Sequence, residues 1–328
     1  MRLSRAIRGT AWALVAAGAA APLLRRRLDL PKGPVLAAAA TAPVALSVAA
    51  PKGRARDVAT CVLQMWAYLA AYEMPNDDPQ ALRERVHIEY PVNVDRVIGF
   101  GKIPTQRLQT LFSREGEING FERVLVWSHW AWFAVPHLAV AYVALRRPEE
   151  LGTAAARMYA VYDLGAVVYW TVPTAPPWWA AAHGYVEELD GHVEVGEFGH
   201  RYDGTGLPLP VRRMMLEYGE RFWGRRWNDL YDVLGGNPLA AMPSLHFATS
   251  LMAARLLSEV DPVAGLVGWS YAATLGLALV YLGEHYAIDV IAGGALAEAV
   301  HRSARPVTPA VHALTRALRH LRELAEDD

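Results

Sequence analysis

Long apolar stretches alternate with short charged clusters along this chain. Several of these stretches run for roughly 17–22 residues with almost no charge, which is the length that a helix needs to cross a bilayer. The pattern predicts eight helices, at residues 6–24, 34–50, 57–73, 124–145, 154–173, 242–258, 262–283 and 286–302. The N-terminal stretch also resembles a signal peptide, although an uncleaved helix is the preferred interpretation. The predicted fold is therefore all-α: a polytopic integral membrane bundle with a six-helix core and about two extra N-terminal helices.

The same pattern predicts three parts along the chain. They are N-terminal membrane helices with a basic loop at 1–56, the six-helix core at 57–302, and a cytoplasmic amphipathic tail at 303–328.

Basic residues in short loops indicate which side of the membrane is cytoplasmic. In an alternating path, the clusters at 52–56, 146–147 and 302–322 share one side, which we expect to be cytoplasmic. Arg25, Arg26 and Arg27 fall on the opposite side and conflict with this orientation. The charged segments at 74–123 and 180–240 then face outward.

Composition supports a membrane protein and narrows its partners. Hydrophobic residues make up 53% of the 328 positions, the mean hydropathy is +0.11, and the net charge is -1. A near-neutral chain of this kind gives no reason to expect nucleic-acid binding. The single cysteine, Cys61, cannot form an intrachain disulfide, and a small buried hydrophobe is the expected role. The expected partners are the bilayer and a substrate from it, and the oligomeric state is not predicted.

Candidate chemistry lies in the C-terminal third. His285 and Asp289 are four residues apart, which on a helix stacks both side chains on one face. A carboxylate beside an imidazole selects one tautomer and raises its basicity, as a nucleophilic histidine needs. His246 stands near the start of the preceding apolar hairpin. Because each arm of roughly 20–30 Å nearly spans a bilayer, the chain should return His285 to the level of His246.

Two further features accompany these histidines. Pro243 and Ser244 suit the first turn of a helix, where free backbone amides and a hydroxyl form an anion-binding end for a phosphate. Residues 169–179 end the fifth predicted helix with prolines and tryptophans, which suit either a shaped wall or an aromatic belt. The candidate pocket residues are Tyr169, Pro173, Pro176, Pro177, Trp178, Tyr281, Arg225 and Arg226.

The segments 237–246 and 281–294 resemble the second and third signatures of the type 2 phosphatidic acid phosphatase superfamily. The forms Pro-Ser-Leu-His and His-Tyr-x-x-Asp, with residues 173–178, look most similar to its inositol phosphorylceramide synthase-like branch. The resemblance implies that His285 attacks phosphorus and becomes a phosphohistidine, that Asp289 orients it, and that His246 protonates the leaving group. It implies no metal or cofactor, and a phospholipid or isoprenoid phosphate as substrate. The turn between the two arms of the hairpin is on the predicted cytoplasmic side, so we expect the site and its substrate on the outer face of the plasma membrane.

The chain also departs from the commoner family pattern. A serine–arginine pair before the nucleophile is replaced by Ala278 and Leu279, and the first signature is not recognisable. In the commoner pattern, the arginine of this pair and the lysine and arginine of the first signature bind the phosphate and stabilise transition-state charge. The candidates to replace them are Arg221, Arg225, Arg226 and Lys102, and the sequence does not choose among them.

Several alternatives stay open at this point. Water or an alcohol such as an inositol-type headgroup could accept the phosphoryl group, so the enzyme is a phosphatase or a phosphotransferase. A metallohydrolase could instead use His246, His285 and Asp289 as ligands, and a non-catalytic transporter or channel could use them as a polar site. For His129 and His137, packing is favoured over substrate contact; Glu89 and Asp95 are exposed candidates for headgroup contact.

Overall fold

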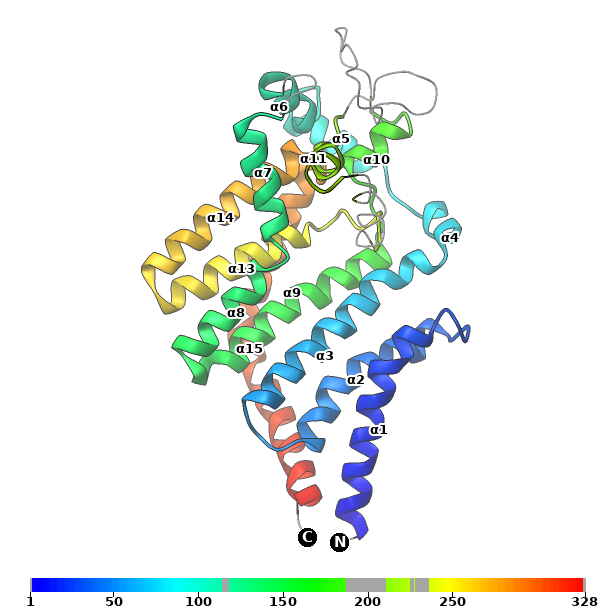
Figure 1. Ribbon diagram of the computed structural model, residues 1–328, viewed down its shortest axis with the longest axis vertical. Coiled ribbons are helices and arrows are strands. Elements are labelled where there is room, and N and C mark those ends of the chain that lie inside the picture. Colours follow the sequence, from blue (N-terminus) through cyan, green and yellow to red (C-terminus); the bar gives the residue numbers. More distant parts are fainter. Residues whose placement is uncertain (1, 114–117, 187–210, 225–226, 228–235, 327–328) are drawn as a thin grey trace. The chain divides into compact units, whose positions relative to one another are not determined.

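The computed structural model describes residues 2–113, 118–186, 211–224, 227 and 236–326 (Figure 1). These residues form helices joined by turns and contain no strand. Within them, two isolated β-bridges join Thr174 to His87 and to Ala240. The predicted all-α fold is therefore confirmed. By its internal contacts the chain forms two compact units, residues 1–78 with 302–328, and residues 79–301.

The first unit contains α1 (Arg2–Leu24), α2 (Lys32–Ala49), α3 (Arg54–Glu73) and the short 3-10 helix η1 (Met74–Asp77). α2 packs against both α1 and α3, so α3 belongs to this unit, whereas the sequence places it in the core. Arg25 forms ion pairs with Asp77 at 2.8 Å and with Glu73 at 3.1 Å. These carboxylates place negative charge beside the basic cluster at 25–27, whose position conflicts with the expected orientation.

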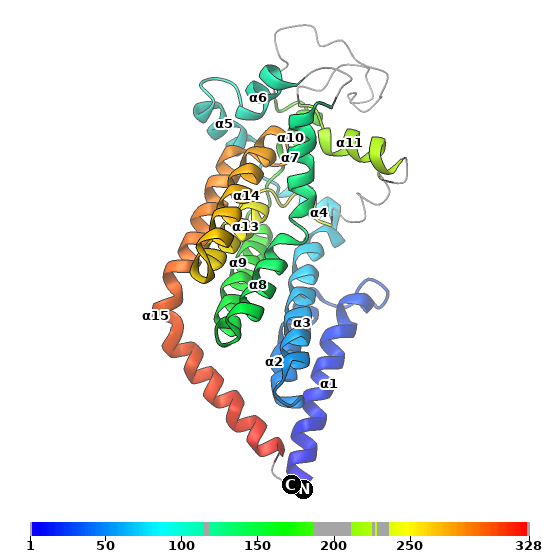
Figure 2. The ribbon, with the colours of Figure 1, turned by 60° about the vertical axis from the view of Figure 1, so that its left-hand side comes forward.

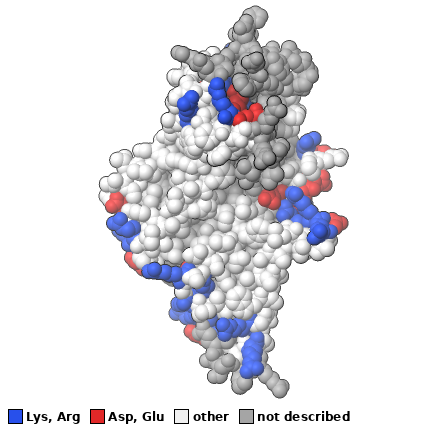
Figure 3. Space-filling model, in the orientation of Figure 1, with Lys and Arg blue, Asp and Glu red and all other residues white. Residues whose placement is uncertain are grey.

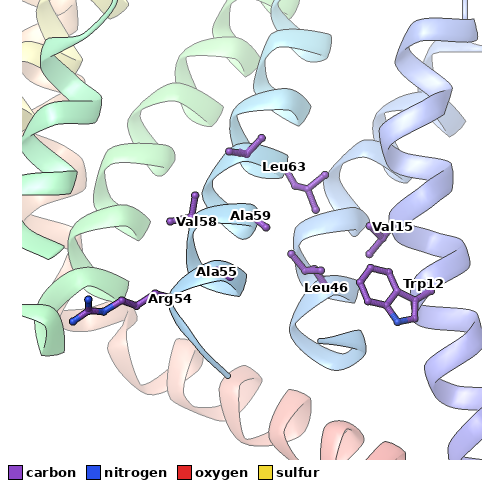
Figure 4. A pocket seen from close by; sticks show the side chains of 9 residues that line it. Trp12, Val15, Leu46, Arg54, Ala55, Val58, Ala59 and Leu63 are labelled. Atoms are coloured by element: carbon purple, nitrogen blue, oxygen red, sulfur yellow. The ribbon is translucent and has the colours of Figure 1, made fainter. Parts of the chain in front are cut away.

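An apolar groove of about 750 Å³ lies among α1, α2 and α3 (Figure 4). Trp12 and Val15 of α1, Leu46 of α2 and the α3 face from Ala55 to Leu63 line it, and the Arg54 side chain points away from the other labelled side chains. None of the predicted site residues lines this groove.

In the second unit, the helix expected at 124–145 is two helices, and that expectation is wrong. α7 (Gly120–Ala131) and α8 (Val135–Arg146) meet at a bend of 58°. Pro136 lies in the first turn of α8, where its missing amide hydrogen and its ring prevent one continuous helix. The 3-10 helix η2 (Pro148–Glu150) then leads into α9 (Leu151–Thr171).

The C-terminal part begins with the hairpin of α13 (Leu245–Val260) and α14 (Pro262–Tyr281), which lie side by side in Figures 1 and 2. Asp261 caps α14: its carboxylate accepts hydrogen bonds from the amides of Val263 and Ala264. α13 also packs against α8 and α9. α15 (Ala287–Glu326) is one continuous helix that covers both the last predicted span and the predicted tail.

Among the described residues, five short α-helices lie in or at the edge of the two segments predicted to face outward. They are α4 (Pro79–Glu84), α5 (Glu89–Ile98), α6 (Pro104–Phe112), α10 (Pro177–Ala182) and α11 (Met214–Trp223). Figures 1 and 2 show α5, α6, α10 and α11 near the end of α14 from which α15 departs. They surround the place where the predicted catalytic residues lie.

Among the described helices, three are long and apolar enough to cross a membrane, and the bent pair α7–α8 would make a fourth. The three are the segments Ser4–Leu24, Lys32–Ala49 and Pro262–Tyr281. Helix length and apolar composition therefore support part of the eight expected spans. Val263, Leu266 and Val267 of α14 are largely exposed, as side chains facing lipid would be. On the face in Figure 3, charged side chains form small clusters and much of the described surface is uncharged.

Candidate active site

The α13–α14 hairpin brings His246 and His285 into direct contact. His246 is the second residue of α13, and His285 follows the end of α14, so both lie at the open end of the hairpin. His246 Nδ1 is 3.2 Å from His285 Nε2, and the two ring centroids are 5.3 Å apart. The convergence expected from the lengths of the two arms is confirmed, while the chemical roles of the histidines stay predictions.

Asp289 lies against the other side of the His285 ring. Its Oδ2 is 3.5 Å from His285 Nδ1 and accepts a hydrogen bond from the Tyr286 amide at 2.9 Å. His285 precedes α15, which starts at Ala287, so the carboxylate reaches back from the first helical turn. A proton on Nδ1 would face Asp289, and the Nε2 lone pair would then be the nucleophile.

Two glycines near His285 are required by the local backbone, one in a turn and one at a close approach between helices. Gly283 has φ +78, and a Cβ there would press on Val211 Cγ1. The amides of both Glu284 and His285 donate to the Leu279 carbonyl, which fixes the chain as it leaves α14. At Gly293 a Cβ would collide with the Ser244 carbonyl oxygen, so this glycine lets α15 approach the start of α13.

Ser244 and Pro243, the predicted phosphate-binding residues, lie at the N-terminus of α13. The buried Ser244 hydroxyl accepts the Phe247 amide as the helix cap, and the Ser244 amide donates to the Asp289 carbonyl at 2.9 Å. The Pro243 carbonyl accepts the Tyr169 hydroxyl at 2.8 Å. The hydrogen bonds of Ser244 and Pro243 therefore hold α13, α9 and α15 together. Phosphate binding by these two residues stays a prediction.

The expected proline and tryptophan wall lies partly beside the His285 turn. Pro173 accepts the His87 amide, while Pro176 and Pro177 begin α10. The Trp178 amide donates to the Gly283 carbonyl at 3.2 Å, two residues before His285. The guanidinium of Arg213 stacks on the Trp178 ring, 3.6 Å from its centroid.

A buried network supports the end of α14. The Tyr281 hydroxyl donates to Glu122 Oε1 at 2.8 Å, and the Gln109 side chain donates to the Tyr281 carbonyl. Arg212 lies 3.6 Å from Glu122 and pairs with Glu217. Tyr281 is therefore a buried part of this scaffold. Of the candidate replacement cations, Arg225 and Arg226 lie outside the described residues, and Lys102 and Arg221 are exposed.

Asp95 was expected to be exposed, and that expectation is wrong, because the side chain is 0% exposed. Its two carboxylate oxygens accept the amides of Ala287 and Ile288 at 2.8 and 3.0 Å, so Asp95 caps α15 from a distant helix. A cap of this kind satisfies helix-end donors that have no partner within the helix. It fixes the first turn of α15, which carries Asp289.

Burial raises the pKa of Asp95 to about 6, with a smaller contribution from Asp289, although the two backbone amides oppose the shift. Since the folded-state pKa lies above the unfolded value of about 4, the folded state binds the proton more tightly. Stability should therefore decrease as pH rises from about 4 to 6. The D95N variant should lack this dependence, because an amide does not titrate in that range.

The D95A variant should have a lower melting temperature than the parent. Losing a helix cap costs about 1–2 kcal/mol, and for a unit of this size 1 kcal/mol shifts Tm by about 2–4 °C. Thermal denaturation in detergent measures the change, and E89A on the exposed side of the same helix is the matched control. Equal melting temperatures for D95A, E89A and the parent would contradict the capping role.

His129 is the residue at this site that sequence reasoning assigned to packing. It lies on α7 with its ring centroid 4.8 Å from that of His246. Trp132, at the bend after α7, places its ring 4.1 Å from His246 and donates to the Thr249 hydroxyl. The only sequence signal was a polar residue within an apolar stretch, which does not reveal its neighbours.

Neither the curated proteins nor the solved structures give a match. A family model described as the PAP2 superfamily matches residues 93–302, which is more than half of the chain and includes His246, His285 and Asp289. The chain therefore belongs to the PAP2 superfamily.

Proposed function

We propose that this protein is a membrane-embedded lipid phosphatase or phosphotransferase that works through a phosphohistidine. Membership of the PAP2 superfamily indicates a phosphatase or phosphotransferase in general. The observation that carries the proposal is that the His285 ring lies between Asp289 and His246. One of its nitrogens faces the Asp289 carboxylate, and the other faces the His246 imidazole.

The two half-reactions follow from this arrangement. His285 Nε2 attacks phosphorus, forming a P–N bond as the P–O bond to the leaving group breaks, and His246 gives its proton to the departing oxygen. Water or an alcohol then attacks the phosphohistidine, His246 takes the proton of that nucleophile, and the P–N bond breaks. Asp289 stabilises the charge on the His285 ring throughout.

The resting contact must open during this cycle. With 3.2 Å between His246 Nδ1 and His285 Nε2, no phosphoryl group fits between the two nitrogens. The substrate phosphate therefore displaces one ring as it binds. The His246 ring packs against Trp132 and His129, so the movement involves this aromatic cluster.

We place the site on the extracytoplasmic face, in contact with lipids of the outer leaflet. Near the α13–α14 turn, Glu259 in the last turn of α13 pairs with Arg157. Arg146 ends α8, and Arg147 follows it directly. Basic residues in short loops favour the cytoplasm, so the opposite end of the hairpin faces outward. A plasma-membrane location and a substrate drawn from that leaflet are part of the proposal.

The substrate and acceptor are tested with purified enzyme in vesicles containing a panel of labelled lipid phosphates and phosphodiesters, including an isoprenoid phosphate. Free myo-inositol is added as an acceptor in one arm. Release of inorganic phosphate indicates a phosphatase. A labelled inositol phosphate from a monoester, or a new labelled phospholipid from a diester, indicates a transferase, as the resemblance to the inositolphosphotransferase branch favours. If no member of the panel is converted at a rate above that of empty vesicles, the proposed function is wrong.

Treatment with a strong chelator should leave the rate unchanged. The nitrogens of His285 face Asp289 on one side and His246 on the other, so these groups point at one another and do not converge on a shared metal position. Initial rates before and after dialysis against the chelator measure the effect. A loss of activity that added zinc restores would favour the metallohydrolase alternative instead.

A further inference from the structure

His129 is a buried histidine that makes no hydrogen bond to the described part of the chain. The side chain is 4% exposed, and neither Nδ1 nor Nε2 has a hydrogen-bond partner. Buried polar groups are nearly always satisfied, and leaving one unbonded costs about 1–3 kcal/mol. A partner that is absent from the protein alone, such as a ligand, would remove this cost.

The position of His129 is at the reacting groups. Its ring centroid is 4.8 Å from that of His246, whose own ring is 5.3 Å from His285. α7, α13 and the turn before α15 thus bring three imidazoles together. By contrast His137 on α8 is exposed and stacks on Tyr162, so proximity to the site is particular to His129.

The phosphoryl group needs donors at this place. Its non-bridging oxygens gain charge in the transition state, and donors aimed at them supply much of the stabilisation in such reactions. The positions that carry serine and arginine in the commoner pattern hold the buried residues Ala278 and Leu279. The nearby Arg212 has its charge directed to Glu217 and Glu122.

We propose that His129 donates a ring N–H to a non-bridging oxygen of the phosphoryl group that His285 attacks. The role rests on the proposed function and adds a binding residue to it. A neutral imidazole has one donor nitrogen, so a single N–H bonds the phosphoryl oxygen and no proton is transferred. The ligand class is a phosphate monoester or diester, held at its phosphoryl group.

Orthovanadate, which mimics the pentacoordinate phosphoryl group, tests this role apart from lipid recognition. In the H129F variant we expect kcat/KM to decrease about 100-fold, and the inhibition constant of vanadate to increase by a similar factor. H129N and H129Q place an amide donor near Nδ1 and Nε2 respectively, so one of them should recover at least tenfold. H137F is the matched control and should keep parent values.

The outcomes separate this proposal from the proposed function. A parent that converts no lipid phosphate and is not inhibited by vanadate contradicts the proposed function itself. An active parent together with a folded H129F variant that keeps the parent vanadate affinity overturns the role of His129 alone. If H129F does not fold, H129M replaces it. If neither variant folds, H129N is compared with H129Q. Their amide donors lie at different positions, so equal vanadate affinities of these two variants would overturn the proposal.

Discussion

Replacing His285 by alanine should lower turnover of every substrate by about 10⁴-fold or more, because the variant lacks the atom that bonds to phosphorus. Its position supports this size of effect: His285 Nε2 faces His246, and Nδ1 faces the buried Asp289. Initial rates in vesicles measure the loss, and melting temperature shows whether the variant is folded.

The same variant should also fail to form a covalent intermediate. Rapid quenching of the parent with a phosphorus-labelled substrate should leave label on the protein that is stable in alkali and lost in acid, as expected of a phosphohistidine. H137F, a histidine replacement away from the site, should keep both the rate and the label. Labelled protein from the H285A variant would show that another residue is the nucleophile.

Replacing His246 by asparagine should lower kcat by about 10²- to 10⁴-fold for a lipid with an alkoxide leaving group, because the variant lacks the proton donor. Asparagine keeps a hydrogen-bonding side chain beside His285, so the nucleophile retains a neighbour. An aryl phosphate substrate, whose leaving group departs without a proton, should release its aryl group in the first turnover at a rate close to that of the parent. Later turnovers should stay slow, because His246 also takes the proton of the second nucleophile. H285A should be inactive toward both substrates, which separates the two roles.

The pH profile gives an independent measure of the proton donor. Attack requires a neutral His285, so the parent rate should fall at low pH. Departure of the leaving group requires a protonated His246, so the rate should also fall at high pH. The H246N variant should lose the high-pH decrease and keep the low-pH one. A parent profile that is flat from about pH 5 to 9 would contradict this pair of roles.

Much of the fold and the centre of the site could be predicted from local pattern. Apolar stretches of bilayer length define α14 and its neighbours, and a rise of about 1.5 Å per residue makes the two arms of the hairpin similar in length. That geometry returns His285 to His246, and the structure places their nitrogens 3.2 Å apart. The spacing of four residues likewise brings Asp289 to His285, although His285 lies before the helix begins.

Only the tertiary structure decided which other groups join this centre. Asp95 and His129 belong to helices that are distant in sequence from α15 and α13, and no periodicity relates them to those partners. Asp95 is buried because α5 meets the first turn of α15, where unbonded amides need an acceptor. The break between α7 and α8 depends on Pro136, yet its consequence, Trp132 against the His246 ring, depends on packing.

The sequence by itself therefore determined the helical class, the hairpin and the proximity of the two histidines and the aspartate, because each follows from periodicity and short spacing. Burial of Asp95, the position of His129 and the use of the Ser244 hydroxyl as a helix cap were decided by contacts between separate segments. Such contacts depend on how helices pack in three dimensions, and a linear pattern of apolar and polar residues does not encode which faces meet.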